Sequence, residues 1–218
     1  MAKKTLAPQQ ERSRESLRKL QKATAEVLGQ HGVEGATIPR IAQHAGLTPG
    51  AIYRRFHDKD ALLEDTILGM LERQGERART SMSPEAAAQI PLTVFAEQVI
   101  NGMVLGYRVN APLLRAMRIF VQGRANTPFW KKACKLEVQS FEHVLELFLA
   151  HRKQIKHPDP RAAIAMGLMM VISTLFETVV MPTDLGPLKT FLPKDDQALK
   201  RELVRAFLSY LGVEQKRS

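Results

Sequence analysis

The chain has 218 residues, a formal charge of +10 at neutral pH and 44% hydrophobic residues, so it can bury the cores of one helical domain and a smaller second one. Its single cysteine, Cys134, excludes an intrachain disulfide framework, and no Cys and His spacing indicates a zinc or other metal site. The first residues are charged and lack the apolar run of a secretory signal, so we expect a cytoplasmic protein.

The positive charge is concentrated at the N-terminal end. Residues 1–60 hold eleven Lys and Arg against six acidic residues, which gives half of the total net charge. This distribution favours a polyanionic partner there. The first fourteen residues are either a mobile tail or an arm that follows DNA phosphates or enters the minor groove. The basic residues of that arm are Lys3, Lys4, Arg12 and Arg14.

The first predicted helix covers about residues 13–30. Leu20, Thr24 and Leu28 recur at helical spacing, and the pattern stops at Gly32. We expect a core helix.

The stretch 37–62 predicts two short helices joined by a glycine turn. Thr37 can cap the first helix, because its hydroxyl accepts an N–H that the helix start leaves without a partner, and Gly46 ends it. Thr48 caps the second helix, where Pro49 occupies a first-turn position at which its missing N–H costs nothing. This arrangement is typical of a helix-turn-helix.

The second short helix carries cations on its free face. Ile52 and Phe56 lie four residues apart and are expected to face inward. The residues left for a partner are Tyr53, Arg54 and Arg55. A short basic helix held at a steep angle by a tight turn suits the DNA major groove, so DNA recognition is the favoured function.

A specific set of residues extends beyond these two helices. A predicted first helix carries Leu20, Thr24, Val27 and Leu28, and a fixed interval separates Gly32 from Thr37. Downstream, Phe56, Lys59 and Leu62 form an F-x-x-K-x-x-L ending. Over residues 12–70 the sequence resembles the TetR-like bacterial transcriptional repressors. The resemblance implies an all-α fold, with a three-helix DNA-binding domain and a larger helical domain for ligand binding and dimerisation.

The resemblance also implies roles for individual residues. Tyr53 and Lys59 would hold phosphates, while Ala51, Arg54 and Arg55 would face bases. Threonine hydroxyls would either contact DNA or serve only as caps. The residues implied to contact DNA are Thr37, Thr48, Pro49, Gly50, Ala51, Tyr53, Arg54, Arg55 and Lys59.

Asp58 caps the next predicted helix, whose apolar residues repeat about every four positions over Leu62–Leu71. The pattern breaks at Ser81–Pro84, where capping residues and a proline occur. We therefore expect residues 1–60 to form the DNA-binding domain with its arm, residues 61–80 a linking helix, and residues 81–218 the effector-binding and dimerisation domain.

The C-terminal domain is expected to be all-α, because no segment alternates over a strand's length. The expected helices are 92–109, 112–123, 129–152, 160–180 and 196–212. The gap over 181–195 contains three prolines and is either a functional or a flexible loop.

The segment 162–181 is apolar almost all round, which is typical of a buried helix. A transmembrane span is the alternative. Polar residues interrupt the segment after a run of eleven, short of the roughly 18 that a span requires. We therefore expect no membrane partner.

The last two helices are candidates for a dimer interface. The apolar stripe of the final helix is wide, and the small residues Ala163 and Gly167 permit close approach. The resemblance implies a four-helix bundle between two subunits; the alternative is that these helices close their own core. The candidate interface residues are Ala163, Gly167, Met170, Thr174, Leu199, Leu203, Phe207 and Leu211.

Large adaptable side chains in the C-terminal domain are candidates for an effector pocket, although apolar residues at helical spacing also form ordinary cores. Glu177 would orient a cationic or hydroxylated ligand, cap a buried Arg, or face the loop. The candidate effector residues are Met103, Tyr107, Met117, Phe120, Phe141, Leu145, Met170, Phe176 and Glu177.

The sequence gives less support to two other classes of function, an enzyme and a protein-binding adaptor. An enzyme lacks support, because the sequence has no phosphate loop, nucleophile elbow or H-E-x-x-H motif. Glu142, His143 and Glu146 have metal-ligand spacing, but the solvated face of a helix explains them more simply. A protein-binding adaptor would leave the basic surface unused. We expect a homodimeric repressor, without cofactor, that a small apolar or amphipathic effector releases from a palindromic operator.

Overall fold

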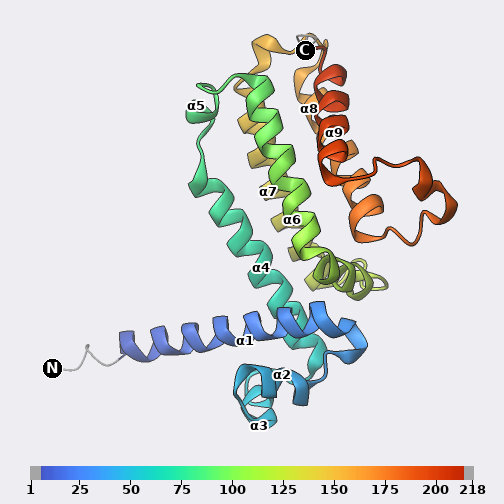
Figure 1. Cartoon of the computed structure of the whole chain (residues 1–218). Helices are drawn as coiled ribbons and strands as arrows, with labels where there is room; N and C mark the ends of the chain where they lie inside the picture. The colour runs from blue at the N-terminus through green and yellow to red at the C-terminus, as the bar shows by residue number, and fades with distance from the viewer. Residues whose placement is uncertain (1–5, 214–218) are drawn as a thin grey trace. The chain divides into compact units, whose positions relative to one another are not determined.

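The computed structural model describes residues 6–213, and every regular element in this range is helical (Figure 1). The expected all-α class is confirmed. The chain divides into two compact units. Unit 1 holds the N-terminal part up to Arg73 together with Pro112–Leu136, and unit 2 holds Gln74–Ala111 and the part from Glu137 onward.

The sequence placed residues 112–136 in the C-terminal domain, whereas the structure assigns them to unit 1. Their apolar side chains, among them Ala116, Phe120, Phe129 and Ala133, belong to the same buried cluster as those of the N-terminal helices. Helical periodicity shows which side chains are buried but does not show which partner buries them.

Unit 1 begins with helix α1 (Leu6–Gly35), followed by α2 (Ile38–Ala45), α3 (Pro49–Tyr53) and the start of α4 (Lys59–Ser81). Gly32 interrupts α1 with φ 68°, a left-handed conformation that favours glycine. Because α1 already starts at Leu6, the expected tail is helical from there on. Lys3 and Lys4, and the side chain of Arg12, lie outside the described residues.

The core of unit 1 joins α1, α2 and α3 to the start of α4, to the end of α6 (Leu92–Val121) and to the start of α7 (Pro128–Leu149). Leu28, Ile41, Ile52 and Leu62 are fully buried in it. These side chains come from four different helices, so the short α2 and α3 are held in place by tertiary packing rather than by their own length.

Unit 2 is built from α6 (Leu92–Val121) up to Ala111, α7 (Pro128–Leu149) from Glu137, α8 (Pro160–Leu175) and α9 (Asp196–Tyr210). Shorter elements are α5 (Pro84–Ala87), two 3-10 helices, η1 (Arg152–Gln154) and η3 (Gly186–Phe191), and the π-helix η2 (Phe176–Val180). The two helices expected over 92–109 and 112–123 form one helix, which contains Pro112. The helix expected over 160–180 changes to π-helix at Phe176.

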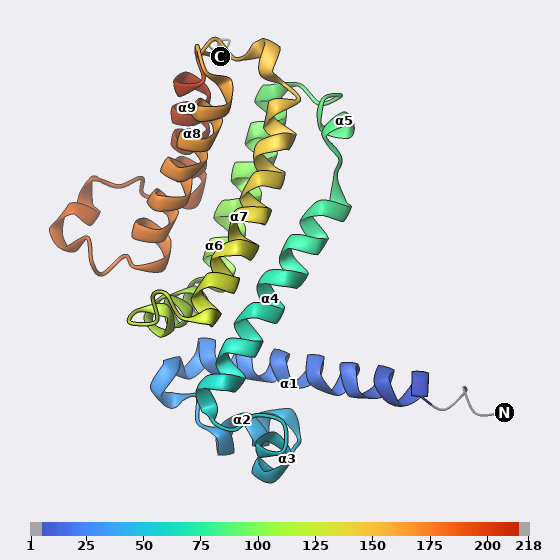
Figure 2. The same ribbon diagram turned by 180° about the vertical axis from the view of Figure 1, so that it is seen from behind.

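Helices α8 and α9 lie side by side in both views (Figures 1 and 2). A Cβ atom added to Gly167 would lie 2.8 Å from the Phe207 ring, so only glycine permits this approach. Phe207 also packs edge-on against Phe148, with ring centroids 5.1 Å apart. The close approach that the sequence assigned to two subunits therefore occurs between two helices of one chain.

Helix α8 with η2, Pro160–Val180, is long and apolar enough to cross a membrane by length and composition, and 44% of that window is buried in the protein. Its inward residues, among them Ile164, Leu168 and Leu175, belong to the core of unit 2. Core packing accounts for this part of its apolar character.

His151 gives unit 2 a pH-dependent stability. Its side chain is 2% exposed, stacks on Phe95 with centroids 5.4 Å apart, and neither ring nitrogen has a partner among the described residues. Burial disfavours the charged ring and lowers the pKa of His151. The unfolded chain therefore takes up a proton first, and stability is lost as the pH falls below about 6.5.

We expect the melting temperature of the wild-type protein to fall between pH 7 and pH 5 more steeply than that of His151→Phe, which keeps the aromatic stack. Differential scanning calorimetry at several pH values measures this, with the exposed residue His31, replaced by Gln, as the control. Equal slopes in wild type and His151→Phe would show that another group governs the dependence.

Candidate functional site

Helices α2 and α3 are fixed at their N-termini by threonine caps. The Thr37 hydroxyl accepts from the backbone N–H of Arg40 at 3.4 Å, and the Thr48 hydroxyl accepts from that of Ala51 at 3.2 Å. Between them Gly46 has φ 64°, a conformation that glycine adopts without steric cost. The capped helix-turn-helix geometry expected from the sequence is therefore present.

Burial separates the two faces of α3. Ile52 is fully buried, whereas Tyr53 is 55% exposed. Arg54 and Arg55 follow directly and are exposed. The candidate residues Thr37, Thr48, Pro49 and Gly50 are also exposed, while Ala51 is half-buried. Thr48 to Arg55 thus present two guanidinium groups, a phenol and a hydroxyl from one short segment, a donor set suited to base edges and phosphates.

Contacts with other helices hold this segment. Arg55 Nη2 donates to the Ser13 hydroxyl of α1 at 3.3 Å, and His44 Nε2 of α2 lies 2.8 Å from Glu26 Oε2 of α1. Sequence patterns do not predict these contacts, because the paired residues lie 42 and 18 positions apart.

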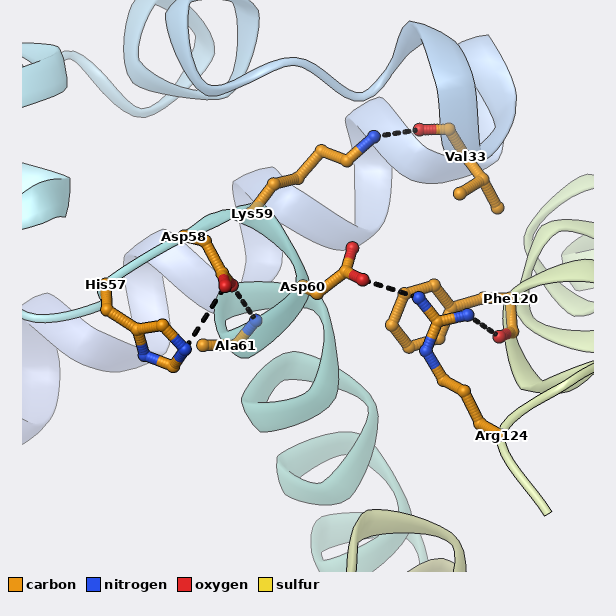
Figure 3. A network of polar contacts seen from close by, with 8 residues as sticks. All are labelled: Val33, His57, Asp58, Lys59, Asp60, Ala61, Phe120 and Arg124. Carbon is orange, nitrogen blue, oxygen red and sulfur yellow. Dashed lines mark hydrogen bonds and ion pairs between the residues drawn. The ribbon is translucent and has the colours of Figure 1, made fainter. Parts of the chain in front are cut away.

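Lys59 has a structural contact within unit 1. Its ammonium donates to the backbone carbonyl of Val33 at 3.1 Å, just after the break in α1 (Figure 3). The side chain is half-buried rather than free. To hold a DNA phosphate as the resemblance implies, Lys59 would therefore use the ammonium N–H groups that do not bond to Val33.

The neighbouring residues of α4 are also engaged (Figure 3). Asp58 Oδ1 accepts from the backbone N–H of Ala61 at 2.8 Å and so caps α4, as expected. Asp60 Oδ2 accepts from Arg124 Nη2 at 2.6 Å, and the Arg124 guanidinium lies 3.7 Å from the centre of the Phe120 ring. This first turn of α4 is thereby tied to α1 and to the α6–α7 turn.

The structure separates the candidate effector residues. Met117 and Phe120 belong to the core cluster of unit 1, where Phe120 packs on Phe129 with centroids 5.8 Å apart. Met170 and Glu177 are exposed. Neither pair is placed to line the interior of unit 2.

The remaining candidates come from unit 2, and two of them touch. Tyr107 and Phe176 pack edge to face with centroids 5.6 Å apart. Met103 and Phe141 are half-buried, and Leu145 is 3% exposed. Glu137 on α7 lies four residues before Phe141 on the same face, and its side chain is exposed.

Most candidate dimer residues are buried within one chain. Ala163, Gly167, Leu199, Leu203, Phe207 and Leu211 lie in the core of unit 2. A different stripe of α8 is exposed: Met166 is 53%, Met169 48% and Met170 39% exposed. Tyr210 of α9 is 40% exposed. Exposed apolar side chains gathered on one helix face are typical of a protein contact surface.

The carboxylates of the possible metal cluster have a protein partner. Arg161 Nη1 donates to Glu146 at 2.8 Å and Nη2 to Glu142 at 3.1 Å. His143 Nε2 lies 3.1 Å from the carbonyl oxygen of Ala78. These contacts explain the three residues as parts of the helical framework.

Comparison with known proteins gives one consistent result. Residues 20–66 match the profile of bacterial regulatory proteins of the tetR family. The chain is 25% identical over 190 residues to the HTH-type transcriptional regulator BetI of Cronobacter sakazakii, which covers 87% of this chain and 91% of that protein. A protein of Mesorhizobium loti assigned to the TetR family superposes with a TM-score of 0.68 at 16% identity, over 92% of this chain and 97% of the other.

The transcriptional regulator FadR from Bacillus subtilis, solved in complex with stearoyl-CoA, superposes with a TM-score of 0.63 at 18% identity, over 88% of this chain and 98% of the other. At these identities the structural likeness shows a shared fold.

Proposed function

We propose that this chain, whose residues 20–66 match the profile of the tetR family, is a DNA-binding transcriptional regulator that acts as a cytoplasmic homodimeric repressor. It binds an inverted-repeat operator through α2 and α3, and it leaves the operator when a small apolar or amphipathic molecule binds unit 2. A twofold dimer presents two recognition helices about one DNA turn (~34 Å) or more apart, which accounts for the inverted repeat.

The observation that carries the proposal is the exposed cationic face of α3. Tyr53, Arg54 and Arg55 are exposed beside the buried Ile52, and capped helix starts fix their direction. The basic excess of residues 1–60 adds long-range attraction for a polyanion.

Two further observations support assembly and release. The exposed methionine stripe on α8 offers an apolar surface to a second subunit. The complex of FadR with stearoyl-CoA supports an apolar ligand for a protein of this fold. Release requires only that the effector binds the form that cannot bind DNA more tightly than the form that can. A difference of about 1.4 kcal/mol between these two binding free energies lowers operator affinity tenfold.

The experiment that tests DNA reading compares two neighbouring residues. The preferred sequence is first selected from random DNA with the purified protein. We expect Arg54→Ala to weaken binding to that sequence by about 1–3 kcal/mol, with little change on random DNA, because a guanidinium bonded to a base edge discriminates between bases. Tyr53→Phe removes a phosphate donor and should weaken both duplexes alike. Binding is measured by fluorescence anisotropy at fixed salt.

Equal losses on both duplexes for Arg54→Ala would contradict its base-reading role. Lys59→Ala is unsuitable as the phosphate control, because it also removes the bond to Val33. Salt-independent binding of the wild-type protein to DNA would contradict the proposed function itself.

A further inference from the structure

The net charge of the chain lies almost entirely in unit 1. Unit 1 contains eighteen Lys and Arg and nine acidic residues, a net charge of +9, whereas unit 2 contains fourteen and thirteen, a net charge of +1. The part of unit 1 up to Arg73 supplies only +3, because its acidic residues offset most of its Lys and Arg. The other +6 comes from Pro112–Leu136, which holds the end of α6, the start of α7 and the turn between them. Most of the charge excess of unit 1 therefore lies outside the helix-turn-helix.

This segment of α6 and α7 has six basic residues and no Asp or Glu. Two of the six, Arg124 and Lys132, form ion pairs with acidic side chains of α4, at 2.6 and 3.0 Å. Three others, Arg118, Lys131 and Lys135, are exposed and form no ion pair with any residue that the structure describes. These three cations are available to an anionic partner.

Helical spacing directs the three cations away from the core. Arg118 lies two residues from the buried Phe120, and Lys131 lies two residues from the buried Phe129. Two residues correspond to about 200° of rotation around an α-helix, so each cation points away from the buried side of its helix. Lys135, one turn beyond Lys131, lies on the same face of α7. Because the Phe120 and Phe129 rings pack with centroids 5.8 Å apart, the two helix ends lie side by side.

These helix ends are fastened close to the recognition segment. Arg124 Nη2 donates to Asp60 Oδ2 on the first turn of α4, at 2.6 Å (Figure 3). Asp60 lies five residues after Arg55, a separation of at most about 18 Å for an extended chain. One turn of DNA covers ~34 Å. The α6–α7 turn therefore lies within one DNA turn of the residues that follow α3.

We propose that Arg118, Lys131 and Lys135, the α6–α7 cationic surface, bind phosphates of the DNA that flanks the operator. Contacts from Lys and Arg to phosphates carry no sequence information, and each releases condensed counterions, so they strengthen binding to any duplex long enough to reach them. The reading of bases stays with the recognition segment. The inference rests on the proposed function in taking α3 as the element that binds the operator, and it adds a second contact with the same duplex.

The test compares two duplexes that carry the same selected operator. One ends at the operator, and the other extends about 15 base pairs, roughly one and a half DNA turns, beyond each end. Fluorescence anisotropy measures binding of the full chain at several salt concentrations. We expect the wild type to bind the long duplex roughly tenfold more tightly than the short one, because phosphate contacts are added. The slope of log affinity against log salt concentration should be steeper by about one for each added contact.

The test variant replaces Arg118, Lys131 and Lys135 together by Gln. We expect it to lose most of the preference for the long duplex and to bind the short duplex within about twofold of the wild type, because the operator contacts remain. The matched control replaces one Arg and two Lys that are exposed in unit 2, Arg152, Lys153 and Lys189, by Gln. It removes the same charge from the chain, so it corrects for the loss of long-range attraction. The control should keep the preference of the wild type.

A test variant that prefers the long duplex as strongly as the control would overturn the α6–α7 cationic surface, and so would an equal loss of affinity on both duplexes. In either case, selection of an operator by the wild type leaves the proposed function standing. The opposite result is also distinguishable. If the wild type selects no sequence from random DNA, while the test variant but not the control binds long random duplexes more weakly, the proposed function fails and the surface stands.

Discussion

Replacing both Met166 and Met170 by Glu is expected to split the proposed dimer and to lower operator affinity roughly 10²–10⁴-fold, because the two DNA-binding domains are then no longer joined and each binds its half-site separately. Both side chains are exposed, 53% and 39% respectively, so the charges do not disturb the core of unit 2. They would oppose association by placing like charges on both copies of a twofold contact. Analytical ultracentrifugation at micromolar concentration and operator titration measure the two effects.

The control is Val138→Glu, a charge at a position of α7 that is 58% exposed. It should leave both the dimer and operator affinity unchanged. A dimer that persists in the folded Met166 and Met170 double variant would place the interface elsewhere, and dissociation of Val138→Glu would indicate α7 instead.

The variant Phe207→Ala is expected to lower the free energy of unfolding by about 3–5 kcal/mol, since truncating a buried Phe removes its transfer free energy and leaves a cavity. Phe207 is 1% exposed, and it packs on Phe148 and against Gly167. The sequence placed Phe207 at the dimer interface, where its loss would weaken association and so reduce the dependence of the melting temperature on protein concentration. Burial within one chain predicts a lower melting temperature at every concentration.

Urea unfolding followed by circular dichroism measures the change in free energy. Tyr210→Ala on the same helix is the control, because Tyr210 is 40% exposed and should cost about 1 kcal/mol or less. A Phe207→Ala protein with wild-type unfolding but weaker association would show that the side chain faces a partner subunit after all.

The helix-turn-helix could be predicted from the sequence because short-range interactions define it. The caps at Thr37 and Thr48 each bond a backbone N–H three residues ahead, and the turn at Gly46 depends on that residue's own φ. Such interactions are the same in any fold that contains the segment. The division of α3 into a buried face at Ile52 and a free face at Tyr53 follows equally from helical spacing.

The interior of the C-terminal half could not be predicted in the same way. Helical spacing identified Phe120, Gly167 and Phe207 as inward residues, and all three are buried. It did not identify what buries them, which is unit 1 for Phe120 and the α8–α9 contact for the other two.

Glu177 shows the same limit for a polar residue. Its apolar setting in the sequence made it a candidate for orienting a ligand, whereas the structure leaves its side chain exposed. Local capping and periodicity thus determined the helices and their buried faces, while tertiary packing decided which faces meet, because contacts between residues far apart in the chain depend on the whole fold.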